Sequence, residues 1–542
     1  MHRIIVSILL ASVAVLATAA THRASWATVP RPDTVVATGQ ADVALASIAG
    51  IVCPTGDAAM HRNATFLADY VAQSTGLRLP LLTTRPAGRP VISLELDAPR
   101  LAPEGYRITA TPDGIEIAGG AAQGVFYGIQ TLRKALPLAA ARSIVIPSAI
   151  VSATPRFAYR GMHLDVSRHF FGKEMVKEYL DILALHGINT FHWHLSDDQG
   201  WRIEIAKWPR LTQEGSRRPR TVIGRNAGIY DNVPVEGYYT RDDIREVVAY
   251  AAARYITVIP EIDMPGHMRA ALAAYPELGC TGGPYTVAET WGVFDEILCG
   301  GNDTVYQFLR DVLDELTELF PSPYIHLGGD EAPKSEWERC PRCRAKIAQL
   351  GIAATDRLTA ENQLQGHMVR MMSDYLKHKG RRLIGWDEIL ECGVDSSAVV
   401  MSWRDYIKDG ADATAAGHDV IMAPNSTMYF DHNQLPAEHR RQPLVFGGYS
   451  PLSKVYGYEP CPATLPAERQ RHVIGVQANL WAEYIAYREL AHYQLLPRLA
   501  ALSEVQWAQP QRKDYADFLA RLPRLLDIYR ACGWRYCPHD IK

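Results

Sequence analysis

Residues 324–331 read YIHLGGDE, an apolar run that ends in two glycines followed by two adjacent carboxylates. Other apolar runs also end in polar or aromatic residues, and amphipathic stretches with helical spacing separate them. The eight runs cover residues 159–166, 189–195, 256–262, 324–328, 383–386, 398–403, 419–423 and 473–480. A strand followed by a helix, repeated eight times, is the pattern of a (β/α)8 barrel. The sequence therefore predicts an α/β protein with a TIM barrel over residues 154–542.

A smaller unit is predicted before the barrel, over residues 25–153. Residues 92–96, 106–111 and 115–118 have strand-like composition, and the sequence Pro112, Asp113, Gly114 predicts a hairpin between the second and third. A helix is expected over residues 121–135. This α+β domain contains no set of acid and base residues, so we expect a structural or docking role for it.

Charge and the first residues of the chain restrict its partners and its location. The 56 Lys and Arg residues nearly balance the 59 Asp and Glu residues, giving a formal charge of −3, so no broad basic surface is available for nucleic acid. Residues 1–20 contain a basic start, an apolar run and a small-residue end, which is the pattern of a secretory signal peptide. We expect an exported protein, periplasmic or secreted, with no membrane span after cleavage. The sequence leaves the oligomeric state open.

The nine cysteines suit an oxidising compartment, where small disulfide loops form. The expected pairs are Cys280 with Cys299, Cys532 with Cys537, and Cys340 with Cys343. The last pair forms a C-x-x-C, which could also be redox-active or half of a zinc site. Because no second C-x-x-C or histidine pair accompanies it, a structural disulfide is favoured over zinc.

The residues that end the eight runs are the candidates for chemistry, because the active site of a TIM barrel lies at the carboxyl ends of its strands. Polar or aromatic residues end every run, which predicts one lined pocket. They are Asp165, Arg168, His192, His194, Asp197, Asp198, Glu261, Asp263, His267, Asp330, Glu331, Trp386, Asp387, Trp403, Tyr429, Asp431, Trp481 and Glu483.

Two chemistries compete for these residues. Metal-assisted hydrolysis would use His192 and His194, which project to one face of a strand, with Asp197 nearby. That scheme needs further histidines on later strands, where the sequence has Trp386 and Trp403 instead. No metal and no organic cofactor are therefore expected.

The favoured chemistry is acid and base cleavage of a glycosidic bond, which requires two carboxylates. Asp330 and Glu331 are the natural pair, and tryptophan side chains provide suitable walls for a sugar. Adjacent residues of a regular strand point to opposite faces, so both carboxylates can serve one site only where the strand breaks. Gly328 and Gly329 permit that break.

Residues 326–331 (HLGGDE) resemble the H-x-G-G-D-E signature of the glycoside hydrolase family 20 β-N-acetylhexosaminidases. Further segments resemble that family's motifs in the same order: residues 160–168, 191–199 (FHWHLSDDQ), 259–267 (IPEIDMPGH), 385–388 (GWDE) and 478–483 (ANLWAE). The resemblance spans about residues 157–507, and an α+β domain before the barrel is usual in the family. It implies an exo-acting enzyme that releases terminal N-acetyl-D-hexosamine, GlcNAc or GalNAc, from β-linked glycans or chitooligosaccharides with retention of configuration.

The resemblance also implies roles for single residues. Glu331 would be the general acid and then the base, with a pKa near working pH. Asp330 would hold the N–H of the substrate's acetamido group and offset the positive charge of an oxazolinium intermediate, which places the family outside the usual two-carboxylate scheme. The implied sugar contacts are Arg168, Trp386, Trp403, Tyr429, Asp431, Trp481 and Glu483, and the implied supporting residues are Asp197, Asp198 and His267.

Two alternatives remain at this point. A disaccharide-releasing member of the family would need a longer pocket, which the loops at 200–239 and 434–468 decide. A carbohydrate-binding protein without catalysis would be expected to lack the acid, whereas Glu331 is present.

Overall fold

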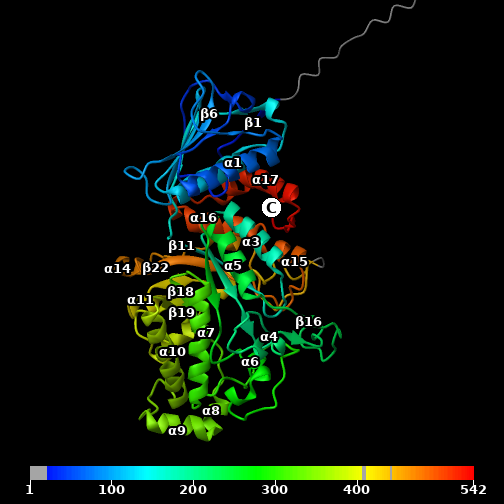
Figure 1. The fold of residues 1–542 in the computed structure, drawn as a ribbon, viewed down its shortest axis with the longest axis vertical. Helices are drawn as coiled ribbons and strands as arrows, with labels where there is room; N and C mark the ends of the chain where they lie inside the picture. The colour runs from blue at the N-terminus through cyan, green and yellow to red at the C-terminus, as the bar shows by residue number, and fades with distance from the viewer. Residues whose placement is uncertain (1–20, 406–409, 440–441, 542) are drawn as a thin grey trace, which may run out of the picture.

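The computed structural model describes residues 21–405, 410–439 and 442–541, so the signal peptide expected at residues 1–20 lies outside them. Two units are stacked along the long axis of the molecule, with the N-terminal domain at one end and the barrel at the other (Figure 1). Among the helices of the described residues, none is long and apolar enough to cross a membrane.

Eight parallel strands form a closed barrel in chain order. They are β11 (Tyr159–Asp165), β12 (Thr190–His194), β17 (Thr257–Glu261), β18 (Tyr324–His326), β19 (Arg382–Trp386), β20 (Val399–Ser402), β21 (Val420–Met422) and β22 (Val473–Ala478). The barrel closes where β11 pairs with β22, Tyr159 opposite Gly475 and Met162 opposite Ala478. Each predicted run overlaps one of these strands, and only β19 begins outside its run, by one residue, which confirms the TIM barrel.

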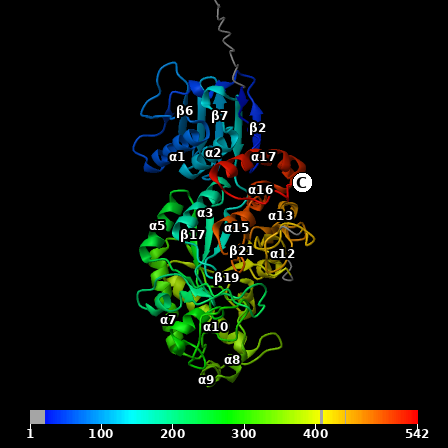
Figure 2. The same ribbon diagram turned by 90° about the vertical axis from the view of Figure 1, so that its right-hand side faces the viewer.

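Amphipathic helices cover the outside of the barrel (Figure 2). The longer ones are α3 (Lys173–Leu185), α5 (Arg241–Ala252), α7 (Asp303–Leu319), α10 (Ala360–His378) and α16 (Arg498–Trp507). Helix α5 begins at a capping box, in which the Thr240 hydroxyl accepts from the Asp243 N–H and the Asp243 carboxylate accepts from the Thr240 N–H. Its buried residues, Ile244, Val247 and Ala251, share one face, as the sequence predicts.

The N-terminal domain contains a seven-stranded sheet, a small three-stranded sheet and two α-helices, α1 (Ala58–Thr75) and α2 (Ala122–Ala135). The small sheet has the order β1 (His22–Arg23), β9 (Ile144–Ile146), β3 (Val43–Ala44). The order of the large sheet is β2 (Thr34–Ala37), β10 (Ala149–Ala153), β7 (Tyr106–Thr111), β8 (Gly114–Gly119), β6 (Val91–Leu96), β4 (Ile51–Val52) and β5 (Leu81–Leu82). The predicted hairpin joins β7 and β8, with Thr111 opposite Gly114. Gly114 has φ of 135° and a Cβ there would lie 2.3 Å from the Val91 oxygen, so the turn requires glycine.

Arg160, in the first strand of the barrel, joins the two domains. Its guanidinium is fully buried and donates to the Glu104 carboxylate at 2.7 and 3.0 Å and to the Tyr127 hydroxyl at 2.8 Å. The ring of Tyr127 also meets the edge of Trp507 at 5.1 Å. Arg160 belongs to the first family-like motif, but its side chain lies at the interface between the two domains and not at the predicted site.

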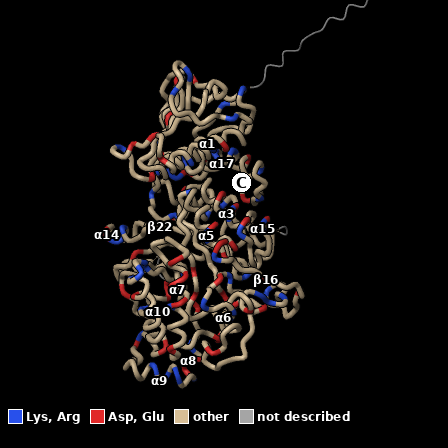
Figure 3. Tube along the Cα trace, in the orientation of Figure 1, with Lys and Arg blue, Asp and Glu red and all other residues tan. Residues whose placement is uncertain are grey.

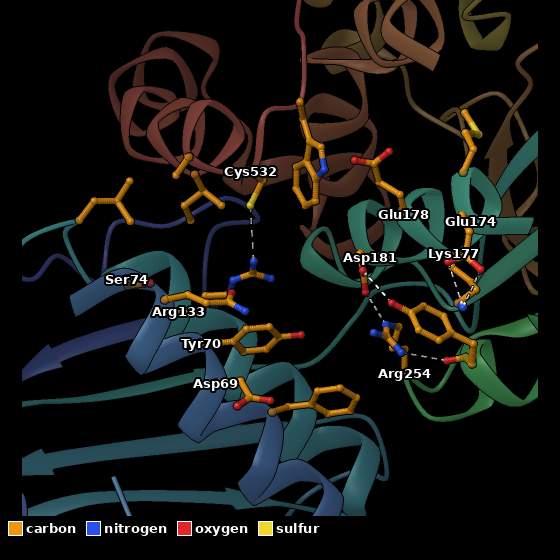
Figure 4. Close-up of a pocket in the computed structure, with 18 of the residues that line it drawn as sticks. Asp69, Tyr70, Ser74, Arg133, Glu174, Lys177, Glu178, Asp181, Arg254 and Cys532 are labelled. Carbon is orange, nitrogen blue, oxygen red and sulfur yellow. Dashed lines mark hydrogen bonds and ion pairs between the residues drawn. The ribbon is translucent and has the colours of Figure 1, made fainter. Parts of the chain in front are cut away.

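A cavity of about 940 Å³ lies between α1, α2, α3 and the C-terminal helix α17 (Tyr515–Cys532). Figure 4 shows charged side chains on its walls, among them Asp181, whose carboxylate accepts from Arg254 at 2.5 Å. On the opposite wall the guanidinium of Arg133 lies over the ring of Tyr70 at 4.0 Å. The cavity is lined by none of the predicted site residues.

Acidic and basic residues are interspersed over both domains along the described chain (Figure 3). This distribution agrees with the near-neutral composition.

The structure does not contain the predicted disulfides, since all nine cysteines are unbonded. Cys532 is exposed at the end of α17 and lies 4.0 Å from an Arg133 nitrogen, whereas Cys537 is buried. The other predicted partners lie in one cluster, with sulfur separations of 3.6–3.8 Å against about 2.05 Å for a disulfide. The pairs Cys280–Cys299 and Cys340–Cys343 were predicted from closeness in sequence, whereas the fold brings all four of these cysteines, from two distant segments, together.

Candidate active site

The carboxyl ends of the barrel strands surround a pocket of about 440 Å³. Of the twelve residues with a predicted catalytic, sugar-binding or supporting role, ten line it, and Trp386 and Asp198 do not. Among the other strand-end candidates, His194 and Asp263 line it, whereas Asp165, His192, Glu261 and Asp387 do not. The lining residues are Arg168, His194, Asp197, Asp263, His267, Gly292, Val293, Asp330, Glu331, Trp403, Asn425, Tyr429, Asp431, His432, Phe446, Gly447, Gly448, Trp481 and Glu483.

The two adjacent carboxylates reach one pocket because the chain bends sharply after β18. Gly328 and Gly329 have φ of 60° and 99°, and a Cβ at residue 328 would lie 1.8 Å from an Asp263 oxygen. Glu331 also adopts a left-handed φ of 43°, which is costly for a residue with a side chain and is typical of functional sites. The Asp330 side chain is 13% exposed and that of Glu331 is 41% exposed, so Asp330 lies deep and Glu331 lies at the mouth.

His267 connects this pair to two further carboxylates. Its Nε2 lies 3.5 Å from Glu331 Oε2 and 3.8 Å from Asp330 Oδ2, and its Nδ1 lies 3.0 Å from Asp198 Oδ2 and 3.3 Å from Asp197 Oδ1. All three predicted supporting residues, Asp197, Asp198 and His267, are thus in contact with one another behind Asp330 and Glu331.

Arg168 is held on one wall by carboxylates at or after the carboxyl ends of three neighbouring strands, β22, β11 and β12. Its guanidinium contacts Asp197 at 2.8 Å, Asp165 at 3.1 Å and Glu483 at 3.9 Å. The Asp165 carboxylate also accepts from the Ala482 N–H at 3.0 Å, which fixes the loop that carries Glu483. The fork of Arg168 is therefore rigid and suited to geometrically specific hydrogen bonds with a ligand.

Aromatic rings form the other wall. Trp403 and Tyr429 are stacked at a centroid distance of 6.1 Å, and Tyr429 lies 6.1 Å from Trp481. Trp386 does not line the pocket as the sequence predicts. It is 1% exposed, its ring centroid lies 5.8 Å from that of Trp481, and its indole N–H donates to Glu261 Oε1 at 2.9 Å.

Comparison with known proteins identifies the family. The model "Glycosyl hydrolase family 20, catalytic domain" matches residues 157–510, and the family's domain 2 model matches residues 26–152. This chain belongs to glycosyl hydrolase family 20.

Relatives of this family 20 protein carry related names. It is 44% identical over 469 residues to a β-hexosaminidase of Porphyromonas gingivalis, a match that covers 85% of this chain and 58% of that protein. A β-hexosaminidase of Akkermansia muciniphila is 33% identical, with 79% and 84% covered. A solved structure of a mutant Streptomyces plicatus β-hexosaminidase in complex with its product GlcNAc superposes with a TM-score of 0.81 at 31% identity, covering 95% of this chain and 98% of that one. The chain thus matches less than two thirds of the length of the Porphyromonas gingivalis relative.

The pKa of Glu331 in this family 20 site differs from the expected value near working pH. The hydrogen bond from His267 lowers it below the ordinary value, although burial acts in the opposite direction. His267 is a strong partner because Asp197 and Asp198 raise its pKa well above the ordinary value despite burial. Burial and the charge of Asp263 raise the pKa of Asp330 well above its ordinary value. A sugar that fills the pocket would displace water from Glu331 and thereby raise its pKa.

Glu261 is a central residue of the site to which the sequence gave no role. Its buried carboxylate contacts His192 at 3.0 Å, His194 at 2.5 Å and His326 at 2.9 Å, in addition to Trp386. His194 contacts Asp197 at 2.8 Å through its other nitrogen, so carboxylates hold both histidines of the metal alternative, His194 at the pocket wall and His192 fully buried. The position of Glu261 at a strand end, within the third family-like motif, was the available signal.

Two more carboxylates support the site: Asp263, a strand-end candidate to which the sequence gave no role, and Glu388, which the sequence analysis did not single out. Asp263 Oδ1 accepts from the Gly329 N–H at 3.0 Å and so supports the bend before Asp330. Glu388 accepts from the Trp403 indole N–H at 3.0 Å and positions that ring. Burial, followed by the charge of Asp330, raises the pKa of Glu388 to about 9.

Asp431→Asn is expected to stabilise the ligand-free protein at pH 8. Burial, followed by the charge of Glu483, raises the pKa of Asp431 from 3.8 to about 8. The folded state then binds a proton that the unfolded state releases, so Asp431 destabilises the protein increasingly as pH rises from about 4 to about 8. We expect the Tm difference between Asp431→Asn and wild type to become more positive from pH 5 to pH 8 in thermal unfolding.

The exposed Asp242, whose side chain is 92% exposed, provides the matched Asp242→Asn control, which should show no such trend. A Tm difference for Asp431→Asn that is constant over this range would contradict the raised pKa.

Proposed function

We propose that this protein is an exo-β-N-acetylhexosaminidase that releases a terminal β-linked N-acetylhexosamine with the help of the substrate's own acetamido group. The observation that carries the proposal is the placement of two adjacent carboxylates at different depths of one pocket, Asp330 inside and Glu331 at the mouth. The β-hexosaminidase names of its relatives support the same activity.

The first step forms the oxazolinium intermediate. The acetamido oxygen attacks C1, the bond from C1 to the leaving oxygen breaks, and that oxygen takes the bond electrons and the proton of Glu331. Asp330 accepts the acetamido N–H and offsets the positive charge that spreads over the new ring. Asp330 Oδ1 suits this role because it is buried and has no hydrogen-bond partner among the described residues.

The second step returns the enzyme to its initial state. Glu331, now a carboxylate, takes a proton from a water molecule while the water oxygen attacks C1. The bond between C1 and the acetamido oxygen breaks, and its electrons restore the acetamide. Two displacements at C1 give a product with the configuration of the substrate.

The floor of the pocket favours removal of a terminal residue over release of a disaccharide. Beneath the sugar-binding walls the barrel is filled by Trp386, Glu261, His192 and His326, each with almost no exposed surface. At the mouth, Val293 and Phe446 are 49% and 60% exposed and offer apolar contacts to the next residue of a glycan. One sugar can thus enter the pocket while the rest of the chain stays outside.

The direct test compares kcat/KM for 4-nitrophenyl β-N-acetylglucosaminide, the matching N-acetylgalactosaminide and the β-glucoside. We expect the acetamido sugars to react faster by about 10⁵-fold or more, because an intramolecular nucleophile gains this much from proximity. Equal rates would contradict the mechanism. Activity on neither acetamido sugar, with measurable binding of GlcNAc, would indicate a carbohydrate-binding protein.

We also propose that the protein is exported, on the composition of residues 2–20. Fractionation of cells that express the full chain should place the protein in the periplasm or the medium, with the mature protein beginning near residue 21. Full-length protein confined to the cytoplasm would contradict export.

A further inference from the structure

Four cysteine sulfurs meet beside the segment that follows the catalytic pair. Cys299 Sγ lies 3.6 Å from Cys343 Sγ and 3.8 Å from Cys340 Sγ, and Cys280 Sγ lies 3.8 Å from Cys343 Sγ. All four sulfurs lie within 4.8 Å of one another. Three of these cysteines are buried and Cys280 is partly buried.

These separations are those of a metal tetrathiolate. Zn–S bonds of about 2.3 Å in a tetrahedron place neighbouring sulfurs about 3.8 Å apart. We propose that Cys280, Cys299, Cys340 and Cys343 bind one Zn²⁺ ion. The site is structural, because four protein ligands leave no open position for water or substrate. Each thiol that coordinates releases its proton to solvent as the thiolate forms.

The backbone around the cluster brings the ligands together. A bridge between Gly279 and Leu298 holds the two ends of the 280–299 loop side by side, and the Cys299 N–H donates to the Leu278 oxygen at 2.9 Å. A Cβ at Gly301 would lie 2.2 Å from the Arg342 carbonyl group and 2.4 Å from the Cys343 nitrogen. A side chain at residue 301 would therefore prevent the close approach of this loop to the helix α9 (Pro341–Gln349).

A fixed positive charge lies beside the sulfurs. Arg342, in the first turn of α9, donates to the Gly279 oxygen at 2.6 Å and to the Cys280 oxygen at 3.3 Å. A Zn²⁺ ion with four thiolates carries a net charge of −2, so a neighbouring guanidinium stabilises the loaded site.

The ion would tie together two segments that shape the pocket. The 280–299 loop carries Gly292 and Val293, which line the pocket rim. Cys340 and Cys343 follow Glu331 by nine and twelve residues, at the junction of α8 (Ser335–Arg339) and α9. Zinc would therefore fix the rim loop relative to the segment after the catalytic pair. This inference concerns metal binding and does not depend on the proposed activity.

The first test is the metal and thiol content of the full chain, purified without added metal or reductant. We expect about one zinc per chain by inductively coupled plasma mass spectrometry. Thiol titration in denaturant with a chelator should then find all nine cysteines free. Two disulfides within the cluster would instead give no zinc and five thiols (nine minus four), and this result would overturn the proposal. So would nine thiols with no zinc retained after incubation with Zn²⁺ and desalting.

The second test uses variants. Cys299→Ser and Cys343→Ser should lose the zinc, whereas Cys392→Ser, which replaces a buried cysteine outside the cluster, should keep about one ion per chain. Retention of zinc by both cluster variants would overturn the proposal.

A measurement on wild-type protein covers the case in which the variants do not fold. Replacement of the metal by Co²⁺ should give the intense visible bands of a tetrahedral ion and a thiolate-to-cobalt charge-transfer band. Weak bands of octahedral cobalt without charge transfer would exclude the tetrathiolate.

Discussion

Glu331→Gln is expected to lower kcat/KM for chitobiose by about 10³-fold, because positioned proton transfer contributes roughly 10²–10⁴ to the rate. Chitobiose has a poor leaving group, whose oxygen must receive a proton as its bond to C1 breaks. The loss should be much smaller for a 2,4-dinitrophenyl glycoside, whose leaving group departs as an anion. The comparison of the two substrates in one variant therefore separates proton donation from binding.

Glu338→Gln is the matched control, since Glu338 is an exposed carboxylate on the helix after the catalytic pair. It should retain wild-type rates on both substrates. If Glu331→Gln lost equal factors on both, Glu331 would not be the acid, and if it lost nothing, the proposed mechanism would be wrong.

Asp330→Asn is expected to lower kcat by about 10²–10³-fold with little change in KM, because loss of a single electrostatic contact to the developing charge has an effect of this size. The asparagine keeps the size of the side chain but removes the counter-charge to the oxazolinium. Steady-state kinetics on 4-nitrophenyl β-N-acetylglucosaminide measures the effect. A loss confined to KM would show that Asp330 only binds the ground state.

Substrates with mono-, di- and trifluorinated acetamido groups test the same residue in another way. Fluorine makes the acetamido oxygen a weaker nucleophile, so wild-type kcat/KM should fall steadily along the series. A flat series would indicate that an enzyme nucleophile attacks C1, and Asp330 would then be the first candidate. Asp405→Asn is the control for the variant, as Asp405 is exposed and lies outside the pocket.

Short-range patterns made the strands and the catalytic bend predictable. Each barrel strand lies in a largely apolar run that polar or aromatic residues follow, and such runs follow from burial on both faces of a parallel sheet. The bend after β18 was also foreseeable, because Gly328 and Gly329 adopt backbone conformations that residues with side chains rarely adopt. The strands and the bend depend on residues within a few positions of each other, so they can be predicted directly from the sequence.

The layer below the pocket and the cysteine cluster were not predictable in this way. Trp386 lies at a strand end like Trp403, yet it is 1% exposed and its indole N–H donates to the Glu261 carboxylate of another strand. Cys280 and Cys299 lie close to Cys340 and Cys343 because a loop after β17 packs on helices after β18. The sequence around these residues indicates neither the contact of Trp386 with Glu261 nor the meeting of the four cysteines.

The sequence by itself thus determined the barrel, its smaller companion domain and the pair Asp330 and Glu331. Tertiary structure decided which side chains reach the pocket, how His267 sets the ionisation of Glu331, and that four cysteines share one site. The physical reason is the separation in sequence over which each interaction acts. Strand periodicity and backbone freedom are local properties, whereas burial, hydrogen-bond partners and metal-ligand geometry arise between residues that only the packed fold brings within a few ångströms of each other.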